Sequence, residues 1–405
     1  MQSGESIIKK ISGDFILNFI ASAVVTAVMQ LLMYPLINRV VGNIIYGNFL
    51  TIIGIVNTIS AVVGTTLNNI RLIRETEYKE KRVNGDFNLL LVVMIIIAML
   101  ISTPIFLMFD ADIVEVILIE VLLAMMSIRG YWSVEYRLRL NYKNILFSNI
   151  VLSAGYLLGC GLLIIFNNWL VPFLAGEIVA LLYLAITTSL RKESYNTTVL
   201  FKRIVRDVIF IGCSTLSANV LIYLDRLVLY PLLGGNAVTT YTVASVGGKF
   251  LGIVATPLAG VLLSYYSQPD FIMTRRRFWF ISLITMGVAI LSLGVIIPIS
   301  PYLIKILYPL AYEEALPIVP LACIAGIMGL ICNFIQPSIL KIAPTKWQLI
   351  KEVVYGGVYI GAGYILLKQY GMIGFCIASI MALAMKMFIL LLLGQVYCKT
   401  NKKAE

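Results

Sequence analysis

DVIFIGCSTLSANVLIYLDRLVLYPLLGGNAVTTYTVASVGGK, residues 207–249, is a long apolar stretch that begins at Asp207, ends at Lys249 and encloses an adjacent pair of opposite charges, Asp225 and Arg226. A charged side chain inside a membrane span costs about 3 kcal/mol on insertion scales, so by default it marks a site or a pathway. The stretch therefore raises two questions, whether the chain crosses a membrane and what the charges do there.

Composition answers the first question. Sixty per cent of the 405 residues are hydrophobic and 13% are charged, with a mean hydropathy of +0.95, whereas soluble domains are about 25% charged. A membrane span needs about 20 apolar residues. The sequence has about twelve such segments, at 12–38, 44–70, 87–109, 113–128, 145–166, 170–190, 207–232, 238–264, 278–299, 315–336, 350–367 and 371–395. These segments predict an all-α, polytopic integral membrane protein.

Several chemistries are disfavoured. The chain has no histidine, and its six cysteines show no CxxC spacing, so neither a zinc site nor a disulfide framework is indicated. No nucleophile elbow, phosphate loop or metalloprotease motif occurs in a suitable context. We therefore expect a protein that is not an enzyme and has no cofactor.

The net charge of +11 follows the predicted topology. Most of the 31 Lys and Arg residues lie in alternate connecting segments, which is the positive-inside pattern and places both termini in the cytoplasm. We interpret the basic surplus as a topology signal that also adheres to anionic lipid headgroups. A nucleic-acid partner is not predicted.

The twelve spans form two halves. An even number of spans before Asp207 makes the seventh span run in the same direction as the first, as in transporters with parallel repeats. The motif Tyr34-Pro35, followed by Gly42, parallels Tyr230-Pro231, followed by Gly234. We predict six-helix lobes at residues 1–195 and 196–405, joined by the basic segment 191–206.

The seventh span carries a polar face. Asn219, Tyr223, Arg226 and Tyr230 are separated by steps of four, three and four residues, which places them on one side of a continuous helix. Asp225 is turned away by about 100°. The face therefore indicates a cavity lining, and a structural ion pair is the alternative.

Further cations lie within or beside spans. Arg71 ends the second span, where it is placed either to contact a phosphate or to reach headgroups; Lys249 and Lys386 lie mid-span. Ion pairs with other helices are the structural alternative for both lysines. Because carboxylates within spans are few, we predict a cavity of net positive potential, which suits an anionic substrate.

Two carboxylates are candidates for ion coupling. Asp14 begins a polar stripe along the first span, and Glu177 lies within the sixth. Either is suited to bind a driving proton or Na⁺; a Glu177 that is simply hydrogen-bonded within the bundle is the alternative. The stripe, which favours a wet cavity, comprises Asp14, Asn18, Ser22, Thr26, Gln30 and Asn38.

Two motifs resemble a known family. Arg39, Gly42, Tyr46, Gly47 and Phe49 match the R-x-x-G-x-x-x-Y-G-x-F signature of Wzx-type polysaccharide flippases of the multidrug/oligosaccharidyl-lipid/polysaccharide (MOP) exporter superfamily. The stretch from Asp225-Arg226 to Ala244 is similar to that family's second signature, although Thr240 stands where glycine is usual.

The resemblance implies a MATE-like fold of two six-helix lobes arranged in a V. It also implies alternating-access transport of polyprenyl-pyrophosphate-linked oligosaccharides from the inner to the outer leaflet of a bacterial cell membrane, for capsule, O-antigen or exopolysaccharide synthesis. A polymerase and glycosyltransferases are the partners it suggests.

Three functions are compared on this basis. For a flippase, Arg226 and Lys249 are the main predicted substrate contacts, with Arg39, Arg71, Lys386, Tyr223 and Asn219 as further ones. An ion-coupled multidrug or cation antiporter of the same superfamily needs a cavity lined by carboxylates. A membrane polysaccharide polymerase or glycosyltransferase needs a large catalytic outer loop, and the predicted outer loops are short.

Overall fold

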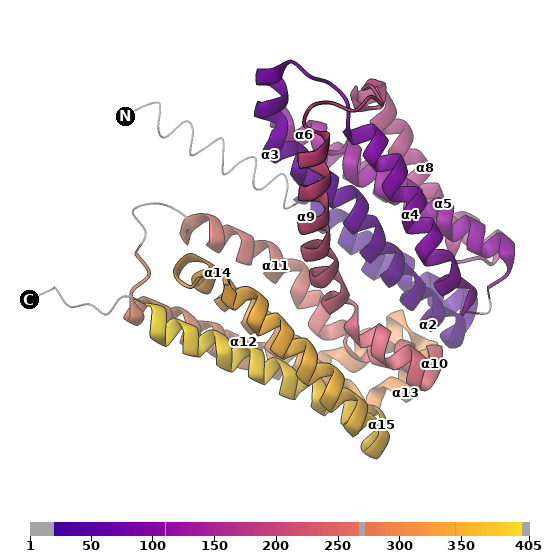
Figure 1. Cartoon of the computed structure of the whole chain (residues 1–405). Helices are drawn as coiled ribbons and strands as arrows, with labels where there is room; N and C mark the ends of the chain where they lie inside the picture. Colours follow the sequence, from indigo (N-terminus) through magenta and orange to yellow (C-terminus); the bar gives the residue numbers. More distant parts are fainter. Residues whose placement is uncertain (1–19, 110, 267–271, 345, 399–405) are drawn as a thin grey trace, which may run out of the picture. The chain divides into compact units, whose positions relative to one another are not determined.

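The computed structural model describes residues 20–109, 111–266, 272–344 and 346–398, and its regular elements are helices (Figure 1). Helices satisfy their backbone hydrogen bonds within one segment, as lipid requires. Eight helical runs among the described residues are long and apolar enough to cross a membrane. The predicted all-α, polytopic membrane fold is confirmed.

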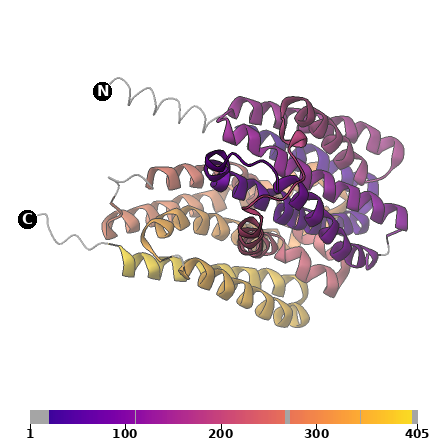
Figure 2. The ribbon, with the colours of Figure 1, turned by 45° about the horizontal axis from the view of Figure 1, so that its top comes forward.

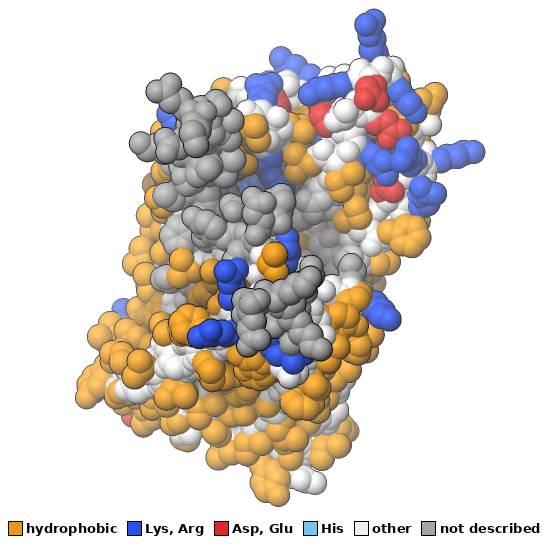
Figure 3. Space-filling view, turned by 90° about the vertical axis from the view of Figure 1, so that its left-hand side faces the viewer, with side chains coloured by type: hydrophobic (Ala, Val, Ile, Leu, Met, Phe, Trp, Pro, Cys, Tyr) orange, Lys and Arg blue, Asp and Glu red, His pale blue; other side chains and the backbone are white. Residues whose placement is uncertain are grey.

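The surface has the character of a membrane protein. Large apolar side chains such as Met108, Ile186 and Leu291 are 80%, 82% and 73% exposed. On the face shown in Figure 3, hydrophobic side chains cover most of the lower part, while acidic side chains gather with Lys and Arg toward the upper end. Exposed apolar area on this scale is stable only against lipid.

The first two predicted spans form one helical run, residues 20–81. After the helical residues 20–27, the run comprises η1 (Val28–Met33), α2 (Tyr34–Ser60), η2 (Ala61–Thr65) and α3 (Thr66–Lys81). Gly42 breaks the helical conformation with φ 81° and ψ 170°, a region that side chains with a Cβ rarely adopt. The expected turn between these spans is therefore a glycine kink.

The next helices match the third to sixth predicted spans. They are α4 (Phe87–Leu107), α5 (Ile113–Trp132) with the short α6 (Val134–Leu138), α7 (Tyr142–Phe166) and α8 (Leu170–Thr187). The α7 and α8 helices pack along each other, and α5 packs on α8 and α4. The turn η3 (Leu190–Lys192) follows α8.

The seventh predicted span, 207–232, is wrong as a single helix. The observed α9 runs from Phe201 to Ile222, Tyr223 interrupts it, and α10 (Leu224–Ala244) follows with its own break at Gly234 (φ 77°, ψ −174°). Gly234 has nearly the same backbone conformation as Gly42. The two glycines stand at different sequence distances from the tyrosine of the repeated Tyr-Pro motif.

The remaining helices are α11 (Val246–Tyr266), α12 (Arg275–Leu307), α14 (Val319–Ile342) and α15 (Lys346–Tyr397), with the short η4 (Pro309–Ala311), α13 (Tyr312–Ala315) and η5 (Leu316–Ile318). The α14 helix packs against α11, α12 and α15, and Figure 2 shows α14 beside α15. Gly371 kinks α15 with φ 59°, so this helix contains both the eleventh and the twelfth predicted spans.

The chain divides into two compact units, Met1–Arg226 and Leu227–Glu405. The α9 helix belongs to the first unit because ion pairs join it to α3: Arg74 lies 2.6 Å from Asp207, and Arg203 lies 2.9 Å from Glu77. The lobe boundary predicted after residue 195 instead places α9 with the second half.

Each unit has an aromatic cluster around the tyrosine that follows its kinked glycine, Tyr46 in the first unit and Tyr241 in the second. In the first unit, the ring of Phe49 lies 5.5 Å from Tyr46 and 5.6 Å from Phe173 of α8. In the second, the ring of Phe375 lies 5.1 Å from Tyr241 and 5.5 Å from Tyr359. The second and sixth predicted spans of each half thus meet through rings, as a half-repeat predicts.

Close helix packing around α7 gives the first testable prediction. A Cβ at Gly155 would lie 2.7 Å from the Cα of Gly176 in α8, whereas a Cβ at Gly161 has no neighbour within 4 Å. Gly155→Ala should therefore lower the free energy of unfolding by about 1–3 kcal/mol through overpacking. Thermal unfolding in detergent, with Gly161→Ala as the matched control, measures the difference; equal midpoints would contradict the packing.

Candidate functional site

Arg226 lies at the helix break that interrupts the predicted seventh span. Its Nη1 donates to the carbonyl of Leu50, 2.7 Å away, and the guanidinium lies 5.2 Å from the ring centroid of Tyr223. Its Nε is buried without a hydrogen-bond partner among the described residues. Asp225 accepts from the backbone N–H of Arg226 at 2.9 Å. The charge of Arg226 is thus held by a carbonyl and a ring rather than by a carboxylate.

The break separates the residues predicted to share a face. Because Tyr223 leaves the helical conformation, the steps of four, three and four residues do not continue through it. The amide of Asn219 donates to the Thr215 carbonyl of its own helix, 2.9 Å away. Tyr223 packs on Gly54, whose Cβ position lies 3.2 Å from the ring. Tyr223 and Arg226 are brought together, and Asn219 bonds within α9.

A cationic cluster lies in α15 of the second unit. The Nζ of Lys386 is 3.0 Å from Glu352, and the Nζ of Lys351 is 3.2 Å from the other oxygen of the same carboxylate. Lys351 is fully buried, and the Lys386 ammonium lies 4.9 Å from the ring centroid of Tyr355. Two ammonium groups share one carboxylate, so the cluster carries a net positive charge.

The sequence located only part of this cluster. The sequence predicts Lys386 mid-span, whereas it places Lys351 at the edge of a span, where the positive-inside pattern by itself explains a basic residue. The adjacent pair Lys351-Glu352 at the start of a span was the signal available. Lys249, another predicted contact, lies in the first turn of α11 and donates to the Thr242 carbonyl at 3.4 Å. Arg39 is exposed on α2.

Arg71 has structural partners. Its guanidinium lies 2.9 Å from Glu75 and 2.6 Å from Glu193, and it lies over the rings of Tyr78 and Phe87 at 5.4 and 4.9 Å. Burial raises the pKa of the Glu193 carboxyl, and the Arg71 charge opposes that shift. The predicted phosphate contact is therefore occupied by protein groups that fasten the segment after α8.

The same segment is held at a second point. The Asp86 carboxylate accepts from the backbone N–H of Thr198 at 2.6 Å and also from the hydroxyl of Tyr78. Together with Arg71 and Glu193, these groups form a clasp, by which we mean Arg71, Tyr78, Asp86, Glu193 and Thr198. The predicted linker is thus bound to the first unit.

Glu177 is paired inside the first unit. Its carboxylate is fully buried and accepts from the Nε of Arg129 in α5 at 2.6 Å and from the Tyr156 hydroxyl in α7 at 3.4 Å. This geometry matches the alternative of a hydrogen-bonded glutamate in the bundle. Arg129 was missed because it was counted as a topology charge. Asp14, the other coupling candidate, lies outside the described residues.

Two polar cavities adjoin at Arg129 and Asn149. The smaller has a volume of about 250 Å³, and Ser22 and Thr26 of the polar stripe line it, as the stripe predicts. The larger, of about 440 Å³, lies among α3, α5, α6 and α7, and Arg129 and Arg137 are its charged residues. Both cavities are built from residues of the first unit alone.

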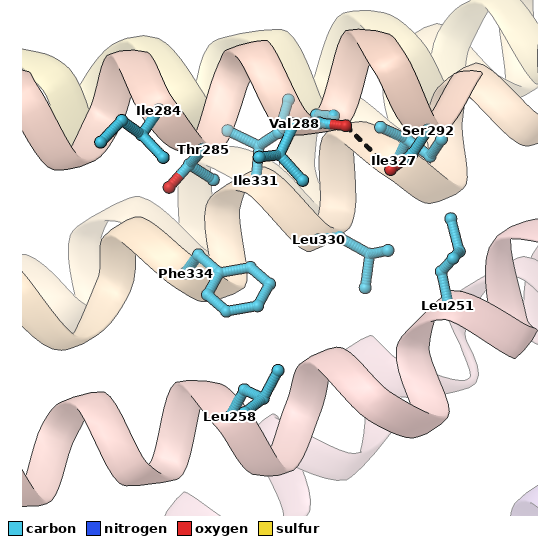
Figure 4. A pocket seen from close by; sticks show the side chains of 11 residues that line it. Leu251, Leu258, Ile284, Thr285, Val288, Ser292, Ile327, Leu330, Ile331 and Phe334 are labelled. Atoms are coloured by element: carbon cyan, nitrogen blue, oxygen red, sulfur yellow. Dashed lines mark hydrogen bonds between the residues drawn. The ribbon is translucent and has the colours of Figure 1, made fainter. Parts of the chain in front are cut away.

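The second unit has an apolar pocket of about 330 Å³ between α11, α12 and α14. In Figure 4, Leu251 and Leu258 of α11 face Leu330 and Phe334 of α14 across the open space. Ser292 turns its hydroxyl back to the Val288 carbonyl, 2.8 Å away. The pocket therefore offers hydrocarbon contacts and suits an aliphatic chain.

Comparison with known proteins gives a fold. No family model and no curated protein sequence matches the chain. Among solved structures, the MurJ lipid II flippase in an inward closed conformation is 16% identical with a TM-score of 0.65, covering 95% of this chain and 86% of that one. A mutant of the Vibrio cholerae MATE transporter VcmN is 14% identical with a TM-score of 0.63, covering 98% of both chains. The chain therefore shares the fold of these solved structures.

An outward-facing MATE multidrug resistance transporter of the MOP superfamily is also similar, with 13% identity, a TM-score of 0.63 and 94% of both chains covered. These structures are of transporters and a flippase. At such identities the likeness concerns the fold, and the substrate has to be argued from this chain's own residues.

The partners of Arg71 give the second prediction. Removing one member of a buried ion pair leaves the other charge uncompensated, which costs about 3 kcal/mol. Arg71→Ala should therefore lower thermal stability strongly, and adding Glu193→Gln should restore part of the loss. Lys79→Ala is the control because Lys79, also paired with Glu75, is 73% exposed. Unchanged stability in Arg71→Ala would return this residue to the substrate contacts.

Proposed function

We propose that the protein is a flippase that moves polyprenyl-pyrophosphate-linked oligosaccharide repeat units from the cytoplasmic to the outer leaflet, for surface polysaccharide synthesis. The supporting observation is the charge of the second unit. Lys249, Lys351 and Lys386 lie in α11 and α15, and Glu352 is the single acidic residue in these two helices. A cationic interior with surplus charge attracts an anionic substrate and repels cations.

Two further features fit a lipid-linked anion. The guanidinium of Arg226 contacts a carbonyl and an aromatic ring. Its remaining N–H groups are donors of the kind that binds a diphosphate. The apolar pocket among α11, α12 and α14 offers a surface for a hydrocarbon chain. Taken separately, the guanidinium suits the headgroup of an anionic lipid, and the pocket suits an aliphatic tail.

We assign the main substrate contacts to Arg226 and Lys249, and we keep Arg39, Lys386, Tyr223 and Asn219 as further candidates. The proposed setting is the plasma membrane of a bacterium, with both termini cytoplasmic. A polysaccharide polymerase and glycosyltransferases are the enzymes expected to act with this protein, since they make and consume its substrate.

The third prediction tests these contacts in cells. In a strain that depends on this chain for surface polysaccharide, Arg226→Ala and Lys249→Ala should each reduce polymer about tenfold or more, as expected for the loss of a charge-assisted contact. Quantified polymer and membrane-inserted protein are compared with Lys368→Ala, an exposed lysine of α15. Normal polymer from the double variant would remove both residues from the site.

An ion-coupled antiporter for cations or multidrug substrates is the second candidate, and the buried Glu177 is the observation that favours it. Because Arg129 already neutralises this carboxylate at 2.6 Å, a cation has to displace an arginine in order to bind. This competition makes cation export less suited to the site than anion transport.

The fourth prediction concerns coupling. We propose that Asp14, or Glu177 once Arg129 releases its carboxylate, binds the driving proton or Na⁺, so transport of a lipid-linked saccharide across a vesicle membrane should respond to a pH or Na⁺ gradient. Asp14→Asn or Glu177→Gln should remove that response while the substrate still binds. Transport that ignores both gradients would end this assignment.

A further inference from the structure

The larger polar cavity of the first unit contains two arginines and lacks acidic lining residues among the described part of the chain. Arg129 of α5 and Arg137 of α6 contribute the charges, and Ser133, Ser148 and Asn149 add neutral polar groups. Because Glu177 balances the charge of Arg129, the surplus charge at the cavity comes from Arg137, and both guanidinium groups supply hydrogen-bond donors. None of the residues predicted from the sequence as substrate contacts lines it.

Arg129 is positioned by a hydrogen bond from its Nε, on one edge of the guanidinium. Its Nε donates to Glu177 at 2.6 Å, whereas its two terminal Nη groups make no hydrogen bond within the described residues. The Arg129 side chain is 25% exposed, although Glu177 behind it is fully buried. Glu177 therefore fixes the side chain from behind and leaves the terminal donors at the cavity wall.

Arg137 is positioned by a second set of contacts. Its Nη1 donates to the side-chain oxygen of Asn68 at 2.9 Å, and the Asn68 amide in turn donates to the Gly130 carbonyl at 2.9 Å. Asn68 is buried. This relay joins α3 to the junction of α5 and α6, so both arginines are placed by buried polar groups.

We infer that this cavity binds a phosphoryl anion, with Arg129 and Arg137 donating to its oxygens. Guanidinium groups pair with phosphate in a bidentate geometry, and two of them at one cavity match a group with several charged oxygens better than a single carboxylate. The inference rests on the proposed function, because the diphosphate of a lipid-linked saccharide is such a group. Free pyrophosphate has the same chemistry.

The binding test uses the full-length chain in detergent, titrated with inorganic pyrophosphate at constant ionic strength in a calorimeter. Arg137→Gln should weaken binding about tenfold or more. Arg129→Gln alone would strand the buried Glu177 charge, so the variant that removes this contact is the double Arg129→Gln/Glu177→Gln, with the same expected loss. Glu177→Gln alone keeps Arg129 and should bind at least as tightly as the unchanged chain.

Arg139→Gln is the matched control, because Arg139 follows α6, is exposed, pairs with Glu135 and does not line the cavity. Its affinity for pyrophosphate should equal that of the unchanged chain. Affinities that are equal in Arg137→Gln, in the double variant and in Arg139→Gln would overturn the site, as would an equal loss in all of them.

A second arm identifies the source of the phosphoryl group. The chain is placed in lipid nanodiscs that contain either polyprenyl pyrophosphate or phosphatidylglycerol at matched charge, and lipid binding is measured for the same variants. Arginine-dependent binding of the polyprenyl lipid supports a headgroup site, and arginine-dependent binding of inorganic pyrophosphate alone supports a cytosolic anion. Saturable binding of neither probe overturns the inference.

Transport separates this inference from the proposed function. Arg137→Gln and the double variant are reconstituted in vesicles and assayed for transport of the lipid-linked saccharide. If they transport it normally although they no longer bind pyrophosphate, the cavity is not part of the transport route and the flippase proposal stands. If the unchanged chain binds pyrophosphate through these arginines but does not carry the saccharide, the flippase proposal fails and the anion site stands.

Discussion

A backbone within lipid must satisfy its own hydrogen bonds, and this constraint shapes the whole chain. Three of the expected breaks between spans are kinks inside longer helical runs rather than separate loops. Gly42, Gly234 and Gly371 carry positive φ values of 81°, 77° and 59°, which glycine adopts without a Cβ clash.

Lipid also constrains how charged side chains are arranged, because a charge buried away from water needs a partner. The first unit encloses an equal pair, Arg129 with Glu177, whereas in the second unit Lys351 and Lys386 share Glu352. A balanced pair satisfies a structural requirement, but a cluster with surplus charge persists only with some further compensation. The surplus charge of the second unit supports an anionic substrate, whereas the anion site inferred in the first unit depends on the guanidinium donors of Arg129 and Arg137 at the cavity rather than on a net charge of the Arg129–Glu177 pair.

Local sequence patterns predicted the positions of the helices, but they did not predict which residues contact one another between helices. Apolar segment length located the helices, and the tyrosine motifs pointed to the positions of two glycine kinks. The break at Tyr223 has no glycine or proline beside it in the sequence, and the residue against which the Tyr223 ring packs, Gly54, is distant in the chain. The sequence left Arg71 as a candidate for substrate binding, because its partner Glu193 lies 122 residues away in the chain. Arg129 and Lys351 were assigned to topology because both stand near span ends, where basic residues are common.

The clasp bears on the order in which the chain is made. Asp86 bonds Thr198, Arg71 bonds Glu193, and Arg74 pairs with Asp207 of α9. Chains are synthesised from the N-terminus and domains fold as units. A nascent chain that ends near residue 190 therefore still lacks these contacts. The earliest complete folding unit includes α9, so a nascent chain halted before α9 remains exposed to membrane quality control.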